Sequence, residues 1–436
     1  MKKTVAIIGG GAAGLMAAAS ICQTAPGTEV HLFEKNTHLG AKVLISGGGR
    51  CNVTTGIHDL KEVLTRYPRG ARFLRTAMYA FPPDAVYAWF ESQGTPLKVE
   101  ADMRVFPRSN QGADVVGAFE KLFARHSGMH VHLRSSVATI QKNGQFIITL
   151  KEGKTFRADA VIITTGGQAF RRTGSTGDGY TFAEEFGHSI TPLAASLSSF
   201  LLAEEWPKHL AGVSFQKAVL SVTQPTKFSY PAPVLLTHKG TSGPAVFAVS
   251  AHVAFEKISR EHPLSLFLDV LPGYTLEELT GYFLSAKQTD QKKHVLTMLT
   301  SLVPRSFAEC VLRELEVAGD TFMVGTSDKS LRKIAQFVKH VPLHIIGRSA
   351  GDEFVTAGGV STSEVDPKTM ESKKIPGLYF AGEVLDVDGY TGGFNLQASW
   401  ATGRLAGLSV SGKNTTLIAK SILEKFDYIT YCCTFT

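Results

Sequence analysis

The first thirty-four residues show a pattern of apolar and small side chains that predicts a βαβ unit. Thr4–Ile8 is a short apolar, β-prone run, Ala12–Cys22 is an alanine-rich stretch suited to a helix, and Val30–Glu34 is again strand-like. The turn after the first strand carries the glycines of a G-x-G-x-x-G motif, Gly9, Gly11 and Gly14. We therefore predict that the chain begins an α/β fold with a parallel sheet.

Further along the chain, period-two patterns separated by short polar turns predict an antiparallel β-meander. Its three strands are expected at Val137–Gln141, Gln145–Leu150 and Thr155–Arg157. They lead into an apolar strand, Ala160–Thr165, which ends at a pair of glycines. Such a meander is typical of flavoproteins, whereas a nicotinamide-dependent dehydrogenase would continue with further βα units.

The pattern changes near residue 193, which indicates an inserted domain. Strand-like runs (Ala218–Gln224, Leu264–Leu271) give way to helical ones (Leu276–Ala286, Lys292–Leu302, Ser306–Glu316, Lys329–Val338). Glycine-ended strands then return (Phe354–Val360, Gly377–Glu383), and a last helix is expected near Gly393. We predict a first nucleotide-domain part at 1–192, an inserted substrate or cap domain at 193–348 (β part about 193–272, helical part about 273–340), a second nucleotide-domain part at 349–412, and a tail helix at 413–436.

Composition narrows the choice of class. Glycine accounts for 42 of the 436 residues, an excess expected where backbone turns sharply or approaches a ligand. The balance of 45 basic and 38 acidic residues gives +7, which is modest for this length, so nucleic acid is not the expected partner. The five cysteines never form C-x-x-C, so we predict no disulfide framework and no metal site. With no long apolar run, we expect no membrane span and a cytoplasmic protein.

The chemistry of the N-terminal motif is that of dinucleotide binding. The first glycine makes the tight turn, the second admits a pyrophosphate, and the helix start offers free N–H groups to it. Glu34 lies 34 − 14 = 20 residues beyond the third glycine, where a carboxylate accepts hydrogen bonds from ribose hydroxyls. Strand, helix and acid together make the motif specific.

Several longer segments carry a resemblance to a known family. They are ISGGGRCNVT (Ile45–Thr54), TTGG (Thr164–Gly167), TGSTGDGY (Thr173–Tyr180), THKGTSGP (Thr237–Pro244), VTAGGV (Val355–Val360) and GLYFAGEVLDVDGYTGGFNLQ (Gly377–Gln397). Up to about Gly412 the chain resembles the bacterial BaiN-like (YhiN-like) NAD(P)/FAD-dependent flavoprotein oxidoreductases, also called aminoacetone oxidase-like. The resemblance implies an α/β fold with a discontinuous, Rossmann-like FAD-binding domain of the glutathione-reductase type. It also implies an insert with a β-barrel-like and a helical part.

The resemblance, read with the motif, implies FAD as cofactor. Its expected binding residues are Gly9, Gly11, Ala12, Ala13, Gly14, Glu34, Lys35, Lys42, Ser46, Gly48, Gly49, Arg50, Cys51, Asn52, Val137, Thr165, Gly166, Gly167, Gly382, Glu383, Gly393, Asn395, Leu396 and Gln397. The helix that begins at Gly393 would aim its N–H groups at the flavin N1/O2 edge. The alternatives are a surface salt bridge for Arg50 and a solvated strand-end carboxylate for Glu383.

The leading hypothesis for the function is NAD(P)H-linked reduction of a small, enoate-like substrate, with NAD(P)H as a transient electron donor. Oxidation of an amine or aminoketone by oxygen is an alternative, and a non-catalytic redox sensor is another. Candidate proton donors are His238, Tyr390 and Arg104. The residues at Gln168–Arg172 and Met103 differ from those usual in the family, which leaves the substrate open. The oligomeric state is open as well.

An RNA-binding or tRNA-modifying flavoprotein is an alternative of another class. Four arginines recur every third residue, Arg66, Arg69, Arg72 and Arg75, and would spread along one side of a helix. No aromatic residues interleave with them as in single-strand binding platforms. A solvated helix face is therefore the simpler explanation.

Overall fold

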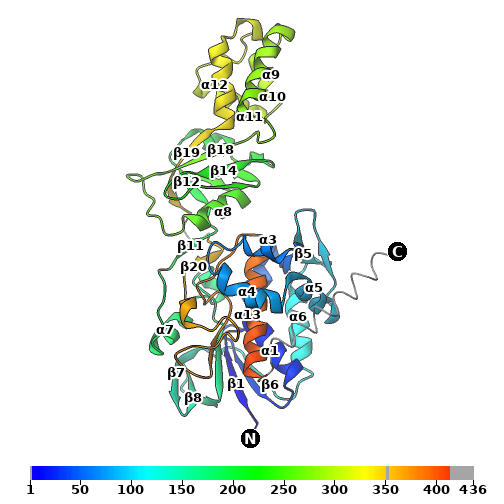
Figure 1. Cartoon of the computed structure of the whole chain (residues 1–436), viewed down its shortest axis with the longest axis vertical. Coiled ribbons are helices and arrows are strands. Elements are labelled where there is room, and N and C mark those ends of the chain that lie inside the picture. The colour runs from blue at the N-terminus through cyan, green and yellow to red at the C-terminus, as the bar shows by residue number, and fades with distance from the viewer. Residues whose placement is uncertain (1, 350–352, 413–436) are drawn as a thin grey trace, which may run out of the picture. The chain divides into compact units, whose positions relative to one another are not determined.

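The computed structural model describes residues 2–349 and 353–412, which divide into two compact units. Unit 1 combines the described residues up to Ala195 with those from Phe354, and unit 2 comprises Ser196–Glu353. The chain thus leaves unit 1 after Ala195 and re-enters it at Phe354. This second segment of unit 1 contains α13 (Phe394–Val410), shown red in Figure 1. The predicted tail helix at 413–436 lies outside the described residues.

A five-stranded parallel sheet is the centre of unit 1. Its order is β21 (Leu378–Phe380), β10 (Ala160–Ile163), β1 (Thr4–Ile8), β2 (Glu29–Phe33) and β6 (Met129–His132). The three middle strands are almost wholly buried, as expected where both faces of a parallel sheet are covered. The sequence pattern predicts four of these strands and not β6.

Helix α1 (Ala12–Thr24) and the meander pack on this sheet, and α13 packs on α1. Helix α1 packs so closely along α13 that only glycine fits at position 403. A Cβ on Gly403 would lie 2.3 Å from the Ala13 carbonyl oxygen. The meander consists of β7 (Val137–Asn143), β8 (Gln145–Leu150) and β9 (Thr155–Ala158), and it contacts β1 and β10. Helix, sheet and meander together form the predicted nucleotide-binding architecture.

The remaining elements of unit 1 surround the strand ends. They are α2 (Ala41–Ile45), η1 (Ser46–Gly49), β3 (Thr54–Thr55), α3 (Leu60–Leu64), α4 (Ala71–Ala80), α5 (Pro83–Ser92), β4 (Leu97–Val99), β5 (Arg104–Pro107), α6 (Gly112–Phe123), η2 (Arg171–Thr173), α7 (Asp178–Glu185), β11 (Ala194–Ser196), β20 (Val355–Ala357) and η5 (Thr362–Glu364). Strands β3, β5 and β4 form a small antiparallel sheet. The aromatic rings of Phe90, Phe119 and Trp400 pack together and join α5, α6 and α13.

The expected arginine stripe does not form on one helix. Arg66 and Arg69 precede α4, and only Arg72 and Arg75 lie on it. Arg66 pairs with Glu62, and Arg69 pairs with the buried Asp388. The spacing of three was a wrong guide because Pro68 and Gly70 interrupt the helical conformation between these residues.

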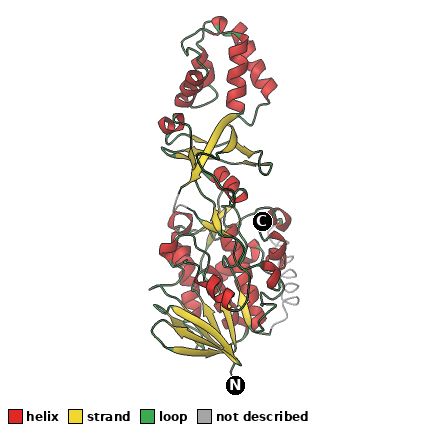
Figure 2. Cartoon of the chain, turned by 90° about the vertical axis from the view of Figure 1, so that its left-hand side faces the viewer, coloured by secondary structure: helices red, strands yellow, loops and turns green. Residues whose placement is uncertain are grey.

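Unit 2 combines an antiparallel sheet with a helical part (Figure 2). The sheet order is β13 (Ser214–Phe215), β16 (Val234–Leu236), β17 (Gly240–Ser242), β12 (Phe200–Leu202), β19 (Val341–Arg348), β18 (Leu264–Asp269), β14 (Val219–Val222) and β15 (Phe228–Pro231). The helices are α8 (Pro244–His252), α9 (Leu276–Thr289), α10 (Val295–Thr300), α11 (Arg305–Glu314) and α12 (Asp328–Lys339), with 3-10 turns η3 (Trp206–Leu210) and η4 (Met323–Gly325). A capping box between Thr275 and Glu278 starts α9 where the sequence pattern predicts a helix.

Among residues 2–349 and 353–412, no helix has the length and apolar character needed to cross a membrane.

Candidate functional site

The carboxyl ends of β1 and β10 meet in glycine turns that touch one another. A Cβ on Gly9 would lie 2.6 Å from the Thr164 carbonyl oxygen, and Gly9 has φ +110°. The Thr164 hydroxyl donates a hydrogen bond of 2.8 Å to the Gly9 carbonyl oxygen. A Cβ on Gly14 would lie only 2.0 Å from that same oxygen, so these positions require glycine.

Beside these turns, the start of α1 is open. Gly11 is the N-cap of α1, no side chain caps the helix, and a Cβ on Gly11 would meet nothing within 4 Å. Ala12 begins the helix, while Ala13 is buried against Gly382, which follows β21. Free N–H groups, the helix dipole and open space form a suitable site for a phosphate group.

Glu34 follows β2 and is held in place by the backbone. Its Oε2 accepts a hydrogen bond of 2.8 Å from the Gly10 N–H, and its Oε1 accepts one of 2.8 Å from the Asn36 N–H. The residue is only 7% exposed. A carboxylate has about four lone-pair sites, so it can accept two further hydrogen bonds, for example from ribose hydroxyls. The neighbouring Lys35 pairs with Asp178 at 2.7 Å.

The loop Ser46–Asn52 is a second glycine cradle. Gly47, Gly48 and Gly49 all have positive φ, and a Cβ on Gly48 or Gly49 would meet nothing within 4 Å. The Ser46 hydroxyl donates to the Val43 carbonyl oxygen, and the Asn52 side-chain oxygen accepts from the Val105 N–H at 3.2 Å. The backbone of this loop is therefore accessible to a ligand, while its polar side chains secure the loop itself.

Cys51 has a structural position in that loop. It is fully buried with φ +60°. Burial raises the pKa of its thiol to about 12, although a hydrogen bond with Ser46 opposes the rise. The thiol is therefore neutral at physiological pH and is not a nucleophile.

Arg50 and Arg104 both contact one aromatic ring, that of Phe106. The Arg50 guanidinium is 3.8 Å from the Phe106 ring centre, and the Arg104 guanidinium is 5.3 Å from it. Arg50 pairs with Glu100 at 2.7 Å, and Arg104 pairs with Asp102 at 2.6 Å. Both arginines thus form ion pairs, and the expected contact of Arg50 with FAD stays a prediction.

Glu383, after β21, is linked to two other parts of the site. Its Oε2 accepts a hydrogen bond of 2.8 Å from Lys42, and its Oε1 accepts one of 2.9 Å from the Thr356 N–H. With its side chain 14% exposed, it is not a fully solvated carboxylate. Gly167 lies against both, because its Cβ would be 2.5 Å from the Thr356 hydroxyl and 3.0 Å from Glu383.

Thr356 is a site residue that sequence reasoning missed. Its hydroxyl accepts hydrogen bonds from the Gln168 N–H at 2.7 Å and the Ala169 N–H at 3.1 Å, and so it shapes the turn after β10. In the VTAGGV segment the glycines are the recognisable signal, and no local pattern marks this threonine. Asp178 of TGSTGDGY, the partner of Lys35, is likewise not marked by a local pattern.

The N-terminus of α13 is fixed by contacts that do not consume its N–H groups. Gly393 is the N-cap with φ +90°, and its Cβ would lie 2.3 Å from the Thr54 carbonyl oxygen. The buried Gln397 side chain accepts from the Thr54 hydroxyl at 2.6 Å and donates to the Phe81 carbonyl oxygen at 2.8 Å. Leu396 is half-buried in the first turn. Helix geometry leaves the first N–H groups without intrahelical partners.

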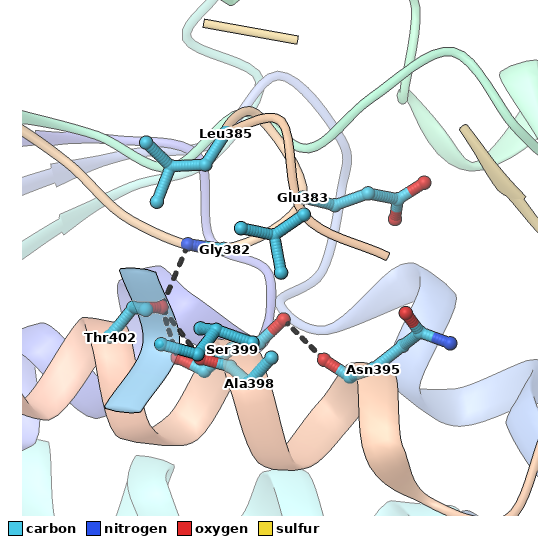
Figure 3. Close-up of a pocket in the computed structure, with 9 residues that line it drawn as sticks. Gly382, Glu383, Leu385, Asn395, Ala398, Ser399 and Thr402 are labelled. Carbon is cyan, nitrogen blue, oxygen red and sulfur yellow. Dashed lines mark hydrogen bonds between the residues drawn. The ribbon is translucent and has the colours of Figure 1, made fainter. Parts of the chain in front are cut away.

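A small pocket separates the turn after β21 from α13 (Figure 3). Its lining includes Gly382, Glu383, Asn395 and Thr402. The Gly382 N–H donates to the Thr402 hydroxyl at 3.0 Å, which ties the turn to the helix. The Asn395 amide exchanges hydrogen bonds of 2.8 and 2.7 Å with Gly389 and so closes the turn that precedes α13.

Two further residues after β10 and one at the meander complete the set. Gly166 has φ +75° beside Ser175, and the Thr165 hydroxyl is buried without a hydrogen-bond partner among the described residues. Val137 begins β7, 9% exposed. The open glycine cradles, the orphaned hydroxyl and the spare acceptor sites of Glu34 are consistent with an extended dinucleotide bound along this edge of unit 1.

The three candidate proton donors occupy different places. Tyr390 lies in the turn before α13, is 4% exposed, and donates its N–H to the Arg66 carbonyl oxygen. Arg104 lies on β5 in the ion pair described above. His238 belongs to unit 2, where it is exposed in the turn between β16 and β17. Tyr390 and Arg104 belong to unit 1, where Tyr390 accepts a hydrogen bond from Asn395 and Arg104 shares Glu100 with Arg50.

Residues 3–409 match the family described as the HI0933-like protein Rossmann domain. The chain belongs to the HI0933-like family. It is a flavoprotein oxidoreductase with an α/β Rossmann fold, as the motifs predicted, and the resemblance stated from them is confirmed.

Among curated relatives of this HI0933-like protein, a ribosomal RNA dihydrouridine synthase from Haemophilus influenzae is 30% identical over 413 residues, with 93% of this chain and 98% of the relative covered. A 3-dehydro-bile acid delta(4,6)-reductase from Clostridium scindens is 28% identical over 405 residues, covering 92% and 98%. Among solved structures, quinol fumarate reductase from E. coli is 16% identical with a TM-score of 0.50, covering 98% of this chain and 74% of that one. The last likeness concerns the fold alone.

Proposed function

We propose that this HI0933-like protein binds FAD along the strand ends of unit 1. The observation that carries the proposal is the meeting, in one unit, of the open α1 N-terminus at Gly11, the carboxylate of Glu34 and the start of α13 at Gly393. They match the chemistry of a pyrophosphate, a ribose and an electron-rich ring edge, respectively.

FAD, when bound, supplies the hydride-transfer chemistry of the enzyme. The chain's own residues bind and orient it. The N–H groups at the start of α13 would stabilise negative charge on the flavin ring, and the Gln397 and Asn395 side chains keep that helix start in place. Glu383 links the turn after β21 to Lys42 of α2 and to Thr356 of β20, and its carboxylate would accept hydrogen bonds from the ribityl hydroxyls.

We further propose that the reaction is NAD(P)H-linked reduction of a carbon–carbon double bond conjugated with a carbonyl group. The two named relatives support this reaction class, because a delta(4,6)-reductase saturates such bonds in a 3-oxo steroid and a dihydrouridine synthase saturates the one in a uracil ring. A small enone is the first substrate class to test.

A uracil ring in RNA is the second substrate class. The observation in its favour is the name of the relative from Haemophilus influenzae, whose full length the chain nearly matches. The arginines of the expected stripe do not add support, because Arg66 and Arg69 are already paired. Oxidation of an aminoketone and a non-catalytic redox role have no comparable support.

The test is product analysis under anaerobic conditions with NADH or NADPH. One arm supplies a steroid enone acid, and the other supplies unmodified ribosomal RNA that is digested to nucleosides afterwards. The proposal expects a product with two added hydrogens in one arm, detected by mass spectrometry. A Tyr390→Phe variant tests one of the candidate proton donors, with Arg72→Ala as a surface control. Absence of a reduced product in both arms, from protein that is fully loaded with FAD, would contradict the proposal.

A further inference from the structure

Three histidines and a glutamate gather on one face of the sheet edge formed by β2 and β6, apart from the residues assigned to FAD. In the parallel pairing His31 lies opposite His130. Side chains two residues apart point to the same face of a strand, so Glu29 shares the face of His31, and His132 shares the face of His130. The register therefore places all four side chains together.

The ligand atoms of three of these side chains converge. The Nε2 of His130 lies 3.3 Å from Glu29 Oε1, and the Nε2 of His31 lies 3.8 Å from the same oxygen. One ligand atom from each of Glu29, His31 and His130 fits within a span of 4.8 Å. We propose that these three residues form a binding site for a divalent transition-metal ion such as Zn²⁺.

The distances are close to those of a metal site. Tetrahedral Zn²⁺ with bonds of about 2.0–2.1 Å to nitrogen and oxygen places neighbouring ligand atoms about 3.3 Å apart. The Glu29–His130 pair already has that separation, whereas the ligand atoms of the whole set lie within 4.8 Å of one another, so His31 has to move closer for a metal ion to bind. Two imidazoles and one carboxylate leave a fourth position for water, and this ligand set selects zinc-like ions over calcium or magnesium.

His132 supplies the supporting contact that metal-binding histidines commonly have. Its Nε2 lies 3.0 Å from the Nδ1 of His31, and their rings stack with centres 5.2 Å apart. The tautomer of His31 that donates from Nδ1 keeps its lone pair on Nε2, the atom nearest Glu29. Phe156 of β9 packs against the rings of both His31 and His132 and limits their rotation.

A metal ion at this place would cross-link the edge strand β6 to β2. The two strands are joined by a long stretch of intervening chain, so the link would add to the four backbone pairings between them. The sequence pattern does not reveal this site, because His31 and His130 are far apart along the chain and match no metal-ligand spacing. The inference is independent of the proposed function, since none of its residues belongs to the FAD set.

The test is titration of untagged, chelator-treated flavoprotein with Zn²⁺, and separately with Co²⁺. We expect one equivalent of Zn²⁺ to bind, and the Co²⁺ adduct to show the intense visible bands of tetrahedral coordination. His130→Gln and Glu29→Gln should each weaken Zn²⁺ binding at least tenfold, and His132→Phe should weaken it roughly tenfold without changing the stoichiometry. His58→Gln is the matched control, because His58 is an exposed histidine paired with Asp84.

Unchanged flavin content and melting temperature without metal identify variants that have folded. The inference is overturned if wild-type protein shows no saturable Zn²⁺ binding, if folded His130→Gln binds as the wild type does, or if His58→Gln abolishes binding. Loss of enzymatic activity plays no part in this readout, so failure here leaves the proposed function untouched.

Discussion

Replacing Arg69 with alanine should destabilise unit 1 strongly. Arg69 reaches Asp388 through two hydrogen bonds, from Nε to one carboxylate oxygen and from an Nη to the other. The Asp388 side chain has no exposed surface, and that of Arg69 is 17% exposed. Removing the guanidinium therefore takes two hydrogen bonds and an ion-pair partner away from a fully buried carboxylate.

The magnitude follows from that burial. Breaking a buried ion pair on one side costs about 3–5 kcal/mol, and each kcal/mol lowers the melting temperature of a unit of this size by about 2–4 °C. We expect Arg69→Ala to melt about 6–20 °C lower than wild type. Because Asp388 begins the turn that leads to α13, the variant should also lose flavin more readily.

The assay is thermal unfolding, monitored by the rise in flavin fluorescence as the protein releases its flavin. Arg72→Ala is the matched control, since Arg72 is exposed on α4 and its loss should change stability by less than about 0.5 kcal/mol. The double variant Arg69→Met/Asp388→Asn should recover at least half of the loss, because the buried carboxylate charge is then removed together with the guanidinium. A shift for Arg69→Ala that equals the shift for Arg72→Ala would refute the reasoning.

Three further predictions concern the site and its surroundings. Gly393→Leu should purify without flavin, because its Cβ would lie 2.3 Å from Thr54, whereas the exposed Gly281→Leu should keep it; full flavin content in Gly393→Leu would sink the placement of α13. Burial opposes ionisation of Glu364, but Lys374 and the Ser189 N–H outweigh it and lower its pKa to about 2. Stability that Glu364 contributes above its ordinary pKa of 4.5 should be lost as the pH falls towards 2, so the melting temperature of Glu364→Gln should fall less over this pH range than that of the wild type. An equal fall of the two melting temperatures would contradict this. The Cys51 thiol, with its pKa raised to about 12 by burial, should escape iodoacetamide in the native protein at mildly alkaline pH; mass spectrometry that finds it labelled as fast as in the unfolded chain would disprove its inertness.

The βαβ unit could be predicted from sequence because local pattern determines it. Thr4–Ile8 was predicted with its observed bounds, and the helix beginning at Ala12 and the strand ending near Phe33 differ from prediction by a residue or two. Apolar runs, alanine content and glycine turns act over a few neighbouring residues, and tertiary contacts did not override them here. Gly393 as the start of the last helix was predictable for the same reason.

Features that depend on distant pairing could not be predicted in this way. Strand β6 has the sequence MHVH, which acquires strand structure by pairing with β2, about a hundred residues earlier. The Arg69–Asp388 ion pair joins positions 319 residues apart. Thr356 stood in a recognised segment, yet its role depends on the Gln168 and Ala169 N–H groups of a separate turn. Such contacts become visible only once the chain has folded.

The most direct test of the central claim is anaerobic stopped-flow spectroscopy of the flavin absorbance. The account predicts that NADH or NADPH bleaches the oxidised flavin band, and that an enone or a uracil-containing RNA restores it faster than oxygen does. Failure of both nucleotides to bleach the flavin, together with rapid reduction by an aminoketone, would contradict the account and identify an oxidase instead.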